Sequence, residues 1–414
     1  MKLIYNFSME LFSILTNLLQ NTNPKLKLFV KGRNKVWQVL EDFKKTSKQP
    51  IVWFHVASLG EYEQAKPVIH QLKKQKPDFS VVVSFFSPSG YENVRKKKQE
   101  DVDFITYLPI DTARNARRFL KILEPKMAFF VKYDLWANYI LEAKNQNIQL
   151  YLFAAALRED QVYFQPFGGF FRKILKSFDH IFTQNERSLD LLHQIDIKNS
   201  SIAGDTRFDR VSQIKAAPVD FGEIKRLITN RKTIVIGSAW PQDMNILIPF
   251  INESDQYSFI IAPHDIHDGT MTDWEGKINK ETIRFSQIST KKSAEVIIID
   301  NVGMLSSLYQ YAFIAYVGGA FGKGLHNILE PLAFGIPVIF GQLKKAKKFP
   351  EAKISLDYGA SCSVATFDEL KTIISELENP ELYQETCKAA NKLVKENLGS
   401  AKKIVELVLI ENQK

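Results

Sequence analysis

The chain has 414 residues, of which 45% are hydrophobic and 24% are charged. This composition is ordinary for a globular protein that is long enough for two domains, each with its own core. The excess of 55 Lys and Arg over 46 Asp and Glu gives a net charge of +9, which suits phosphorylated ligands or an anionic membrane surface. The two cysteines, Cys362 and Cys387, have no metal or redox spacing and argue against a disulfide framework. The sequence carries no nucleic-acid-binding signature, so no nucleic-acid partner is expected.

The N-terminal segment, residues 3–19, is rich in apolar residues but is interrupted by polar ones such as Asn6 and Glu10. It falls short of the ~20 mostly apolar residues of a membrane-spanning helix, and it lacks the small-residue cleavage site of a secretory signal. Cationic residues follow directly: Lys25, Lys27, Lys31, Arg33 and Lys35. We therefore expect residues 1–35 to form a membrane-associated segment on a cytoplasmic membrane surface. The alternative is a helix that docks on the protein itself.

The first half of the chain alternates strand-like and helix-like stretches. Strands are expected at 51–57, 80–86, 126–132, 148–154 and 180–183, with helices at 59–74 and 88–98 and helices that end near 144 and 194. This alternation of strands and helices predicts a mostly parallel sheet that is covered on both faces by helices, in a domain of residues 36–210.

The pattern breaks near residues 204–218, which are polar and irregular, so we place the domain hinge there. Alternating elements then return, with strands expected at 233–237, 258–262, 295–300, 312–317 and 336–340, and with helices over 369–412. These elements give a second domain of residues 211–414. The sequence therefore predicts an α/β protein of two Rossmann-like, doubly wound domains that face a central cleft, with ligands at the carboxyl ends of the strands.

The most informative motif is the glycine-rich loop of residues 318–331, which follows one of these strands. Glycines let the backbone approach a ligand closely, and free N–H groups at the start of the next helix attract negative charge. His326, Asn327 and Glu330 add hydrogen-bonding side chains at the same edge. The loop therefore indicates a phosphate-binding site. The alternative is a tight turn in which Asn327 is the helix N-cap and Glu330 is the N3 residue of a capping pair.

The segment Ser58-Leu59-Gly60-Glu61 lies where the first strong strand ends and its helix begins. Glu61 there would be a fixed carboxylate that can take a proton from an attacking hydroxyl. Gly60 would let the backbone run close to a ligand. The alternative is a capping box, because Ser-x-x-Glu lets Glu61 reach back to its own N-cap.

Lys132-Tyr133-Asp134-Leu135-Trp136 ends another parallel strand at the same edge. A cation, the carboxylate of Asp134 and an aromatic ring suit a sugar that carries a carboxyl group. The alternative is a solvated junction with Trp136 packed in the core.

In the second half, Pro263 and His264 end an apolar run. His264 could contact a phosphate or an acid group, although most histidines in such loops are solvated. No third ligand stands at metal spacing, so we expect no metal. Arg207, near the hinge, could reach into the cleft or could pair with Asp205 or Asp209.

Four motifs occur in one order and spacing along the chain. They are His55-Val56-Ala57-Ser58-Leu59-Gly60-Glu61, Gly204-Asp205-Thr206-Arg207-Phe208-Asp209, Asp300-Asn301-Val302-Gly303-Met304-Leu305 with Leu308-Tyr309, and the loop of residues 318–331. Over about residues 1–400 the chain resembles the 3-deoxy-D-manno-octulosonic acid (Kdo) transferases of lipopolysaccharide biosynthesis, which have the GT-B glycosyltransferase fold. Each motif alone is weak, but the four together are specific.

The resemblance implies an inverting transfer of Kdo from CMP-Kdo to the glucosamine disaccharide of the lipid A precursor lipid IVA, on the cytoplasmic side of the cell inner membrane and without a cofactor. Glu61 matches the family's general base, which deprotonates the acceptor hydroxyl. The nucleotide-binding motif matches Gly318, Gly319, His326, Asn327 and Glu330, with Glu330 placed to bond the ribose hydroxyls. Further substrate contacts are expected at Ser58, Gly60, Asp134, Arg207, Pro263, His264, Gly303 and Met304. The sequence specifies no oligomeric state.

Several positions depart from the family pattern. Where Glu-Thr-Glu-Leu-Trp-Pro-Asn is common, this chain has Lys132 in place of the first acid and Asp134 in place of the second. The usual Pro-Arg-His is here Pro263-His264, without the arginine, and the usual Ser-Thr-His ends here in Trp240. We expect a divergent branch with an altered acceptor or sugar pocket, because the matches to the general base and to the ribose-binding acid are both present.

Two other interpretations stay open. One is a different GT-B enzyme that uses a UDP-sugar, such as a lipid-linked glycosyltransferase or a nucleotide-sugar epimerase. The nucleotide that raises the melting temperature separates it from the first, because a ligand stabilises the state that binds it. The other is a non-catalytic scaffold at the membrane surface, which would have no need of a carboxylate at position 61.

Overall fold

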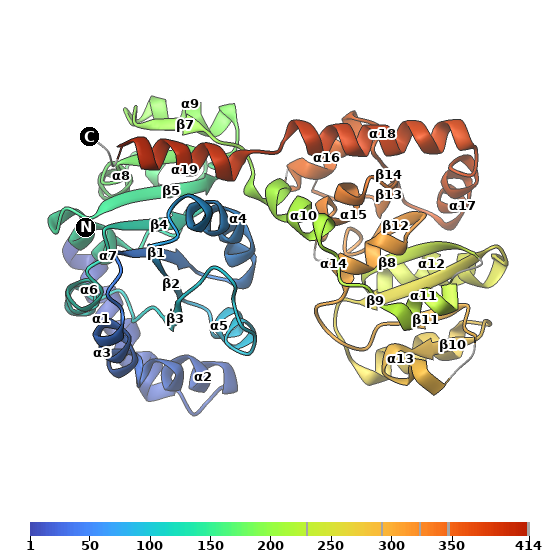
Figure 1. Cartoon of the computed structure of the whole chain (residues 1–414), viewed down its shortest axis with the longest axis horizontal. Helices are drawn as coiled ribbons and strands as arrows, with labels where there is room; N and C mark the ends of the chain where they lie inside the picture. The colour runs from blue at the N-terminus through green and yellow to red at the C-terminus, as the bar shows by residue number, and fades with distance from the viewer. Residues whose placement is uncertain (229–230, 291–292, 323, 346–347, 412–414) are drawn as a thin grey trace. The chain divides into compact units, whose positions relative to one another are not determined.

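The computed structural model describes residues 1–228, 231–290, 293–322, 324–345 and 348–411. Lys323, in the glycine-rich loop, lies outside these ranges. The chain divides into two compact units (Figure 1), which are Met1–Arg210 together with Gly399–Lys414, and Val211–Leu398.

The first unit is built on a parallel sheet that has seven strands within the described residues, in the order β3-β2-β1-β4-β5-β6-β7. The strands are β1 (Ile51–Val56), β2 (Ser80–Phe85), β3 (Phe104–Tyr107), β4 (Met127–Val131), β5 (Gln149–Ala155), β6 (His180–Thr183) and β7 (Ser200–Ile202). The central strands are runs of mostly apolar residues that are buried along their whole length, as a parallel sheet covered by helices requires. The chain runs outward from β1 to β3 and then returns to β4 on the other side of β1, so β1 and β4 flank a topological switch point.

Helices cover both faces of this sheet. One face packs against α3 (Val36–Thr46), α6 (Ala113–Leu123), α7 (Ala137–Asn145), α8 (Gly169–Leu175) and α9 (Glu186–Gln194), with the 3₁₀ turn η1 (Val162–Phe164). The other face packs against α4 (Leu59–Gln75), α5 (Pro88–Val94) and α19 (Ser400–Glu411). Ser58, Thr112 and Asn185 start α4, α6 and α9, because each side chain accepts a hydrogen bond from the backbone N–H three residues further on.

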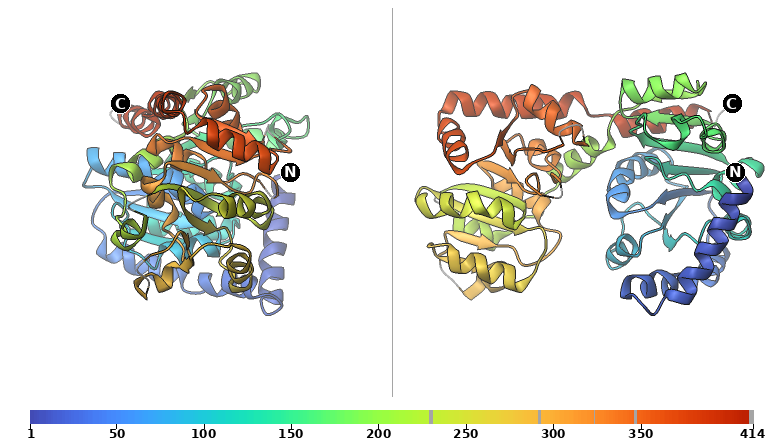
Figure 2. Two further views of the ribbon diagram at one scale, coloured as in Figure 1. Left: turned by 90° about the vertical axis from the view of Figure 1, so that its right-hand side faces the viewer. Right: turned by 180° about the vertical axis from the view of Figure 1, so that it is seen from behind.

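The N-terminal helix α1 (Lys2–Leu19) lies along the first unit (Figure 2). The hydroxyl of Tyr5 donates a 2.5 Å hydrogen bond to the buried carboxylate of Asp111. The Tyr5 ring contacts Phe170 and Phe171, with ring centroids 5.7 and 6.5 Å apart. Along the described part of the chain, no helix is long and apolar enough to cross a bilayer. Through the contacts of Tyr5, α1 docks on the protein itself, which is the alternative that the sequence left open.

The next helix, α2 (Pro24–Arg33), ends at Arg33, whose guanidinium group is hydrogen-bonded within the protein. The Arg33 guanidinium donates to the carbonyl oxygens of Leu108 and Phe86 at 2.8 and 2.7 Å. Arg33 therefore has a structural role and is not part of the exposed cationic surface that the sequence had predicted. The other predicted members of that surface are exposed: Lys25, Lys27, Lys31 and Lys35.

The second unit repeats the plan, again with a parallel sheet whose described strands number seven, in the order β10-β11-β9-β8-β12-β13-β14. They are β8 (Lys232–Ala239), β9 (Tyr257–Pro263), β10 (Thr282–Arg284), β11 (Val296–Ile298), β12 (Ile314–Val317), β13 (Val338–Gly341) and β14 (Ser361–Val364). Here the switch point lies between β8 and β12.

Helices cover this sheet on both faces as well. One face packs against α12 (Pro241–Glu253), α13 (Asp268–Lys277) and α17 (Phe367–Glu376). The other packs against α11 (Gly222–Ile228), α14 (Leu305–Leu308), η2 (Phe285–Thr290) and η3 (Tyr309–Tyr311). The remaining helices are α15 (Leu329–Phe334), α16 (Pro350–Asp357) and α18 (Pro380–Glu396), and α18 packs on α15.

The predicted α/β architecture with two doubly wound parallel sheets is confirmed. The sequence does not predict β3, β7, β10 and β14, because strands of three or four residues at or near a sheet edge carry little periodicity. Residues 206–216, which the sequence predicts to be irregular, form α10 (Thr206–Ala216), and the boundary between the units falls inside this helix. The helix predicted at 88–98 ends at Val94.

The predicted second domain, 211–414, is too long at its end. Gly399–Lys414 belongs to the first unit. The reason is apolar burial, since Ile404, Val405 and Val408 of α19 join the core that also holds α4.

Candidate active site

The first group of predicted site residues lies at the switch point of the first sheet. Glu61 stands in the first turn of α4, directly after β1, and Asp134 follows the neighbouring strand β4. Ser58 and Gly60 belong to the same turn as Glu61. Because parallel strands end at one edge, these four residues share the edge where open α/β sheets bind ligands.

Glu61 makes the contacts of a helix cap. The hydroxyl of Ser58, the N-cap of α4, accepts a 3.4 Å hydrogen bond from the Glu61 N–H. In return, Glu61 Oε2 accepts a 2.5 Å hydrogen bond from the backbone N–H of Ala57, one residue before the N-cap. The capping interpretation therefore describes a real contact, which orients the carboxylate and is compatible with catalysis. A Cβ on Gly60 would lie 3.9 Å from Ser58 Oγ, so no steric contact within the protein requires glycine there.

The surroundings of Glu61 raise the pKa of its carboxyl group from 4.5 to about 7. Burial is the largest cause, and the negative charge of Asp134 is the next. The N–H of Ala57 and the charge of Lys132 act in the opposite direction. The result is a carboxyl group that exchanges its proton near neutral pH, as a general base requires.

A buried hydrogen-bonded chain adjoins Asp134. Trp53 Nε1 donates to Ser84 Oγ at 2.8 Å, and Ser84 Oγ lies 2.9 Å from Nδ1 of the fully buried His55. The other ring nitrogen of His55, Nε2, is 3.7 Å from Oδ2 of Asp134. Neither of these two atoms has a hydrogen-bond partner among the residues that the structure describes. Asp134 therefore lies near both a buried imidazole and Glu61.

The other residues of the 132–136 segment divide between core and surface. The Trp136 ring lies 4.4 Å from that of Phe86 and is partly buried, as the core-packing alternative predicts. Tyr133 is exposed. Lys132 has a φ of 63°, which is uncommon for a residue with a Cβ. Such a strained backbone at a strand end is typical of functional sites.

The second group of predicted residues lies at the equivalent edge of the second sheet. Pro263 ends β9 and His264 follows it, while Gly318 follows β12. Trp240 follows β8, the strand between these two. Three neighbouring strands therefore end together at the switch point.

Three aromatic rings meet at this edge. Trp240 stacks on His264 with ring centroids 4.2 Å apart and planes 19° apart, and His264 lies 4.4 Å from His326. Trp240 Nε1 and His326 Nε2 are joined by a 3.0 Å hydrogen bond. Burial, and then the charge of His264, lowers the pKa of His326 to about 4. The His326 ring is therefore neutral at physiological pH.

The glycine turn after β12 is held by groups of the protein. Gly319 has a φ of 97°, and a Cβ there would lie 2.4 Å from the carbonyl oxygen of Gly324, so glycine is required. The Gly319 N–H donates to Oδ2 of Asp243 at 2.9 Å. The Gly318 N–H donates to the carbonyl oxygen of Gly237 at 2.9 Å. Neither of these N–H groups supplies a phosphate cradle in this structure.

The helix that follows the loop, α15, has six residues. Its N-cap is Ile328, so the prediction of Asn327 as N-cap is wrong by one residue. Asn327 still caps the helix, because its Oδ1 accepts from the Leu329 N–H at 3.2 Å and its Nδ2 donates to Glu330 Oε1 at 3.1 Å. The predicted capping pair of Asn327 and Glu330 is thus present. It occupies a backbone N–H that a phosphate would otherwise use.

The structure gives the remaining predicted residues local roles. Arg207, in α10, pairs with Asp205 at 2.7 Å, which is one of the two pairings that the sequence allowed. Gly303 is exposed and has a φ of 92°. Met304 packs in the core of the second unit, so a ligand contact there would have to use its backbone.

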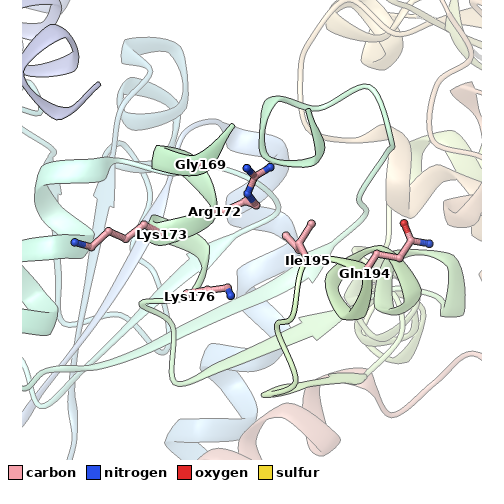
Figure 3. A pocket seen from close by; sticks show the side chains of 6 residues that line it. All are labelled: Gly169, Arg172, Lys173, Lys176, Gln194 and Ile195. Carbon is pink, nitrogen blue, oxygen red and sulfur yellow. The ribbon is translucent and has the colours of Figure 1, made fainter. Parts of the chain in front are cut away.

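A separate pocket of about 510 Å³ lies beside α8 and α9 of the first unit (Figure 3). Its lining residues are Gly169, Arg172, Lys173, Lys176, Gln194 and Ile195. Arg172 donates to the carbonyl oxygens of Tyr163 and Gln165 at 3.1 and 2.8 Å, and Lys173 points away from the other lining residues. The cations therefore do not converge on one ligand position. Across the described ranges, no three His, Cys, Asp or Glu side chains come together as a metal site requires.

The structural role of Asp243 and the pairing of His55 with Ser84 were not predicted from the sequence. A signal exists for Asp243, which stands three residues after Trp240 at the spacing of a capping acid, and its Oδ2 accepts from the Trp240 N–H at 3.0 Å. His55 and Ser84 give no such signal, because they face each other across β1 and β2.

Known proteins that are similar to this chain share one description. Residues 33–210 match the family described as 3-deoxy-D-manno-octulosonic-acid transferase (kdotransferase). The chain is 28% identical over 352 residues to the 3-deoxy-D-manno-octulosonic acid transferase of Rickettsia felis, over 81% of this chain and 75% of that protein. It is 27% identical over 352 residues to the protein of the same name from Chlamydophila psittaci, over 80% of this chain and 78% of that protein.

Solved structures share the fold. The UDP-GlcNAc 2-epimerase of Neisseria meningitidis, bound to UDP-GlcNAc, gives a TM-score of 0.63 at 18% identity, over 87% of this chain and 99% of that chain. MurG of Acinetobacter baumannii gives 0.56 at 14% identity, over 87% and 99%. At these identities the likeness shows the fold alone, which is the two-sheet architecture of GT-B glycosyltransferases. The chain is thus similar to Kdo transferases over most of its length, as its sequence motifs predict.

Proposed function

We propose that this protein transfers Kdo from CMP-Kdo to the glucosamine disaccharide of a lipid A precursor, as an inverting glycosyltransferase of lipopolysaccharide biosynthesis. The observation that carries the proposal is Glu61, a buried carboxylate at the switch point of the first sheet with a pKa of about 7. The similarity to Kdo transferases over 352 residues supports the donor and the acceptor class.

Glu61 would act as the general base. An acceptor hydroxyl oxygen attacks the anomeric carbon of Kdo while its proton passes to the Glu61 carboxylate. The bond from that carbon to the phosphate oxygen breaks, and CMP leaves with the electron pair. Attack from the face opposite the phosphate inverts the configuration. A base with a pKa near the working pH is ionised often enough to accept the proton and basic enough to hold it.

The donor nucleotide would bind at the edge of the second sheet. His264 and His326 offer ring N–H groups to phosphate oxygens, and Glu330 offers carboxylate oxygens to ribose hydroxyls. Gly319 keeps the loop close to β12, where a Cβ would collide with the Gly324 carbonyl oxygen. The donor site would therefore rely on side-chain donors, since the two glycine N–H groups are already bonded.

The N-terminal helix supports a location on the cytoplasmic surface of the inner membrane, where the lipid acceptor would be met. The side of α1 that faces the protein is mostly polar: Tyr5, Asn6, Met9, Ser13, Thr16 and Gln20. The opposite side exposes apolar residues: Leu3, Ile4, Phe7, Leu11, Ile14, Leu15 and Leu18. A helix of a water-soluble protein normally buries its apolar side, so this reversed arrangement fits a helix that lies in a lipid surface. The exposed lysines of residues 25–35 suit anionic headgroups.

The test is transfer by the purified full-length protein, with CMP-Kdo and a tetraacylated, bisphosphorylated lipid A precursor, read by mass spectrometry. We expect a product heavier by one or more Kdo units. If no product forms although CMP raises the melting temperature, the acceptor assignment is wrong. If UDP raises the melting temperature and CMP does not, the donor assignment is wrong.

A further inference from the structure

The hydrogen bond between Trp240 and His326 determines where the imidazole proton resides. An indole nitrogen can only donate, so Nε2 of His326 must accept the 3.0 Å bond and cannot carry a proton. A neutral imidazole has one N–H, which therefore lies on Nδ1.

The neighbours of His326 oppose a second proton. Protonation at Nε2 would set two N–H groups against each other and break the bond to Trp240. His264 lies against the His326 ring at 4.4 Å, and a positive charge on either ring disfavours one on the other. Burial acts in the same direction, and only Asp265 favours the charged form.

The carboxylates of Asp243 and Glu330, among the residues that the structure describes, also lie at this edge. The Asp243 carboxylate is directed at the N–H groups of Gly319 and Trp240, and it is fully buried. Glu330, on the segment that follows His326, is bonded to Asn327. Both carboxylates are therefore engaged with partners other than the imidazole.

We infer that Trp240 is a positioning residue that fixes His326 as the neutral Nδ1–H tautomer, so that His326 meets the nucleotide phosphate as an uncharged hydrogen-bond donor. The tautomer requires no ligand, whereas its effect on the nucleotide rests on the proposed function. Its consequence is that the contribution of His326 to nucleotide binding does not change between about pH 5 and pH 8.

The first test is a long-range proton–nitrogen NMR spectrum of the histidine-labelled wild-type protein. The His326 signals are assigned by their absence from His326→Gln. We expect the nitrogen shifts of a neutral ring protonated on Nδ1, unchanged from about pH 5 to pH 8. A proton on Nε2, or a titration within this range, would overturn the inference without the use of any variant at Trp240.

The second test is Trp240→Phe, which keeps a ring to stack on His264 but removes the N–H donor. We expect this variant to lose the single tautomer, so that its His326 nitrogen shifts move towards those of a mixture of the neutral Nδ1–H and Nε2–H forms. The wild-type protein should keep the nitrogen shifts of the Nδ1–H form alone. Trp274→Phe, in α13 of the same unit, controls for the loss of an indole elsewhere.

The outcomes separate the two proposals. An unchanged His326 spectrum in Trp240→Phe contradicts the inference. If CMP binds neither protein while the tautomer behaves as expected, the proposed function is wrong and the tautomer assignment stands.

Discussion

The carboxylate of Asp243 accepts a 2.9 Å hydrogen bond from the backbone N–H of Gly319 and so joins the start of α12 to the glycine turn after β12. The same oxygen accepts from the Trp240 N–H, and the other accepts from the Tyr316 hydroxyl at 3.1 Å. Because Asp243 is fully buried, these bonds replace the water that the carboxylate has lost. The turn therefore takes its shape from the protein before any ligand binds.

Gly319→Ala tests the importance of this shape. The new Cβ would meet the Gly324 carbonyl oxygen at 2.4 Å on a backbone with φ of 97°, so we expect a loss of about 2 kcal/mol or more in unfolding free energy, with weaker CMP binding. Denaturant unfolding and calorimetry measure the two effects. Gly359→Ala is the matched control, because Gly359 also has a positive φ but a Cβ there has nothing within 4 Å. Equal losses in the two variants would show that the collision does not matter.

Glu61→Gln separates catalysis from helix capping. The amide oxygen of glutamine can still accept from the Ala57 N–H, so the capping contact survives, whereas the base is lost. We expect the rate of Kdo transfer to fall by roughly 10²- to 10⁴-fold, with CMP binding nearly unchanged and a melting temperature that is no lower. Near-normal turnover would show that Glu61 is only a cap. Ser58→Ala, which removes the cap and keeps the base, should instead lower stability by about 1 kcal/mol.

The rate of transfer should rise with pH through about 7, because Glu61 accepts a proton only when it is ionised. Asp134→Asn removes a charge that raises the pKa of Glu61, so the midpoint of this rise should move to lower pH by roughly one pH unit or less. A pH profile of kcat/KM for both proteins gives the two midpoints. A midpoint that stays in place would exclude Asp134 as a cause of the raised pKa.

Stability should respond to pH in the opposite sense. In the folded protein Glu61 holds its proton up to about pH 7, while in the unfolded chain the carboxyl group loses it near 4.5. Between these values the folded state binds more protons, so the contribution of Glu61 to unfolding free energy falls as the pH rises. Glu61→Gln should remove this dependence, which denaturant unfolding at several pH values measures.

Membrane association should depend on the exposed side of α1. Phe7→Ser combined with Leu18→Ser removes two large apolar side chains that are 69% and 73% exposed. Each such side chain contributes about 1.5–3 kcal/mol when it enters an apolar phase, so binding to anionic vesicles should weaken by about tenfold or more. Leu356→Ser, at an exposed position of α16, should leave vesicle binding unchanged. Equal binding by all three proteins would contradict a role for α1.

The sequence is sufficient to predict the sheet strands that carry the site. Those strands are four or more residues of buried apolar side chains followed by a glycine or a capping residue, as at β1 with Ser58 and β12 with Gly318. Glu61 and the histidines of the second unit could therefore be placed at strand ends before any coordinates were known. The motif order along the chain then indicated the family.

The contacts that tune the site could not be predicted, because they join residues that are distant in sequence. Asp134 acts on Glu61 only because β4 returns beside β1, and Trp240 reaches His326 only because β8 lies beside β12. Periodicity reports which face of an element is buried, but not which side chain it meets there. For the same reason, the sequence could not show that the Gly319 N–H is already bonded and so not free for a phosphate. Its partner, Asp243, lies 76 positions away from Gly319 in the chain.

The return of α19 to the first unit has a consequence for how the protein is made. The carboxylate of Asp209 accepts from the N–H groups of Gly399 and Ala401 at 2.7 and 2.9 Å, so the chain leaves the first unit and re-enters it at one point. The second unit can therefore fold on the ribosome as an uninterrupted stretch, whereas the first is completed only after α19 has been made. Until then, the apolar surface that receives Ile404 and Val408 stays uncovered. A chain that stops after the second unit would carry that exposed surface permanently, which makes it a target for chaperones and proteases.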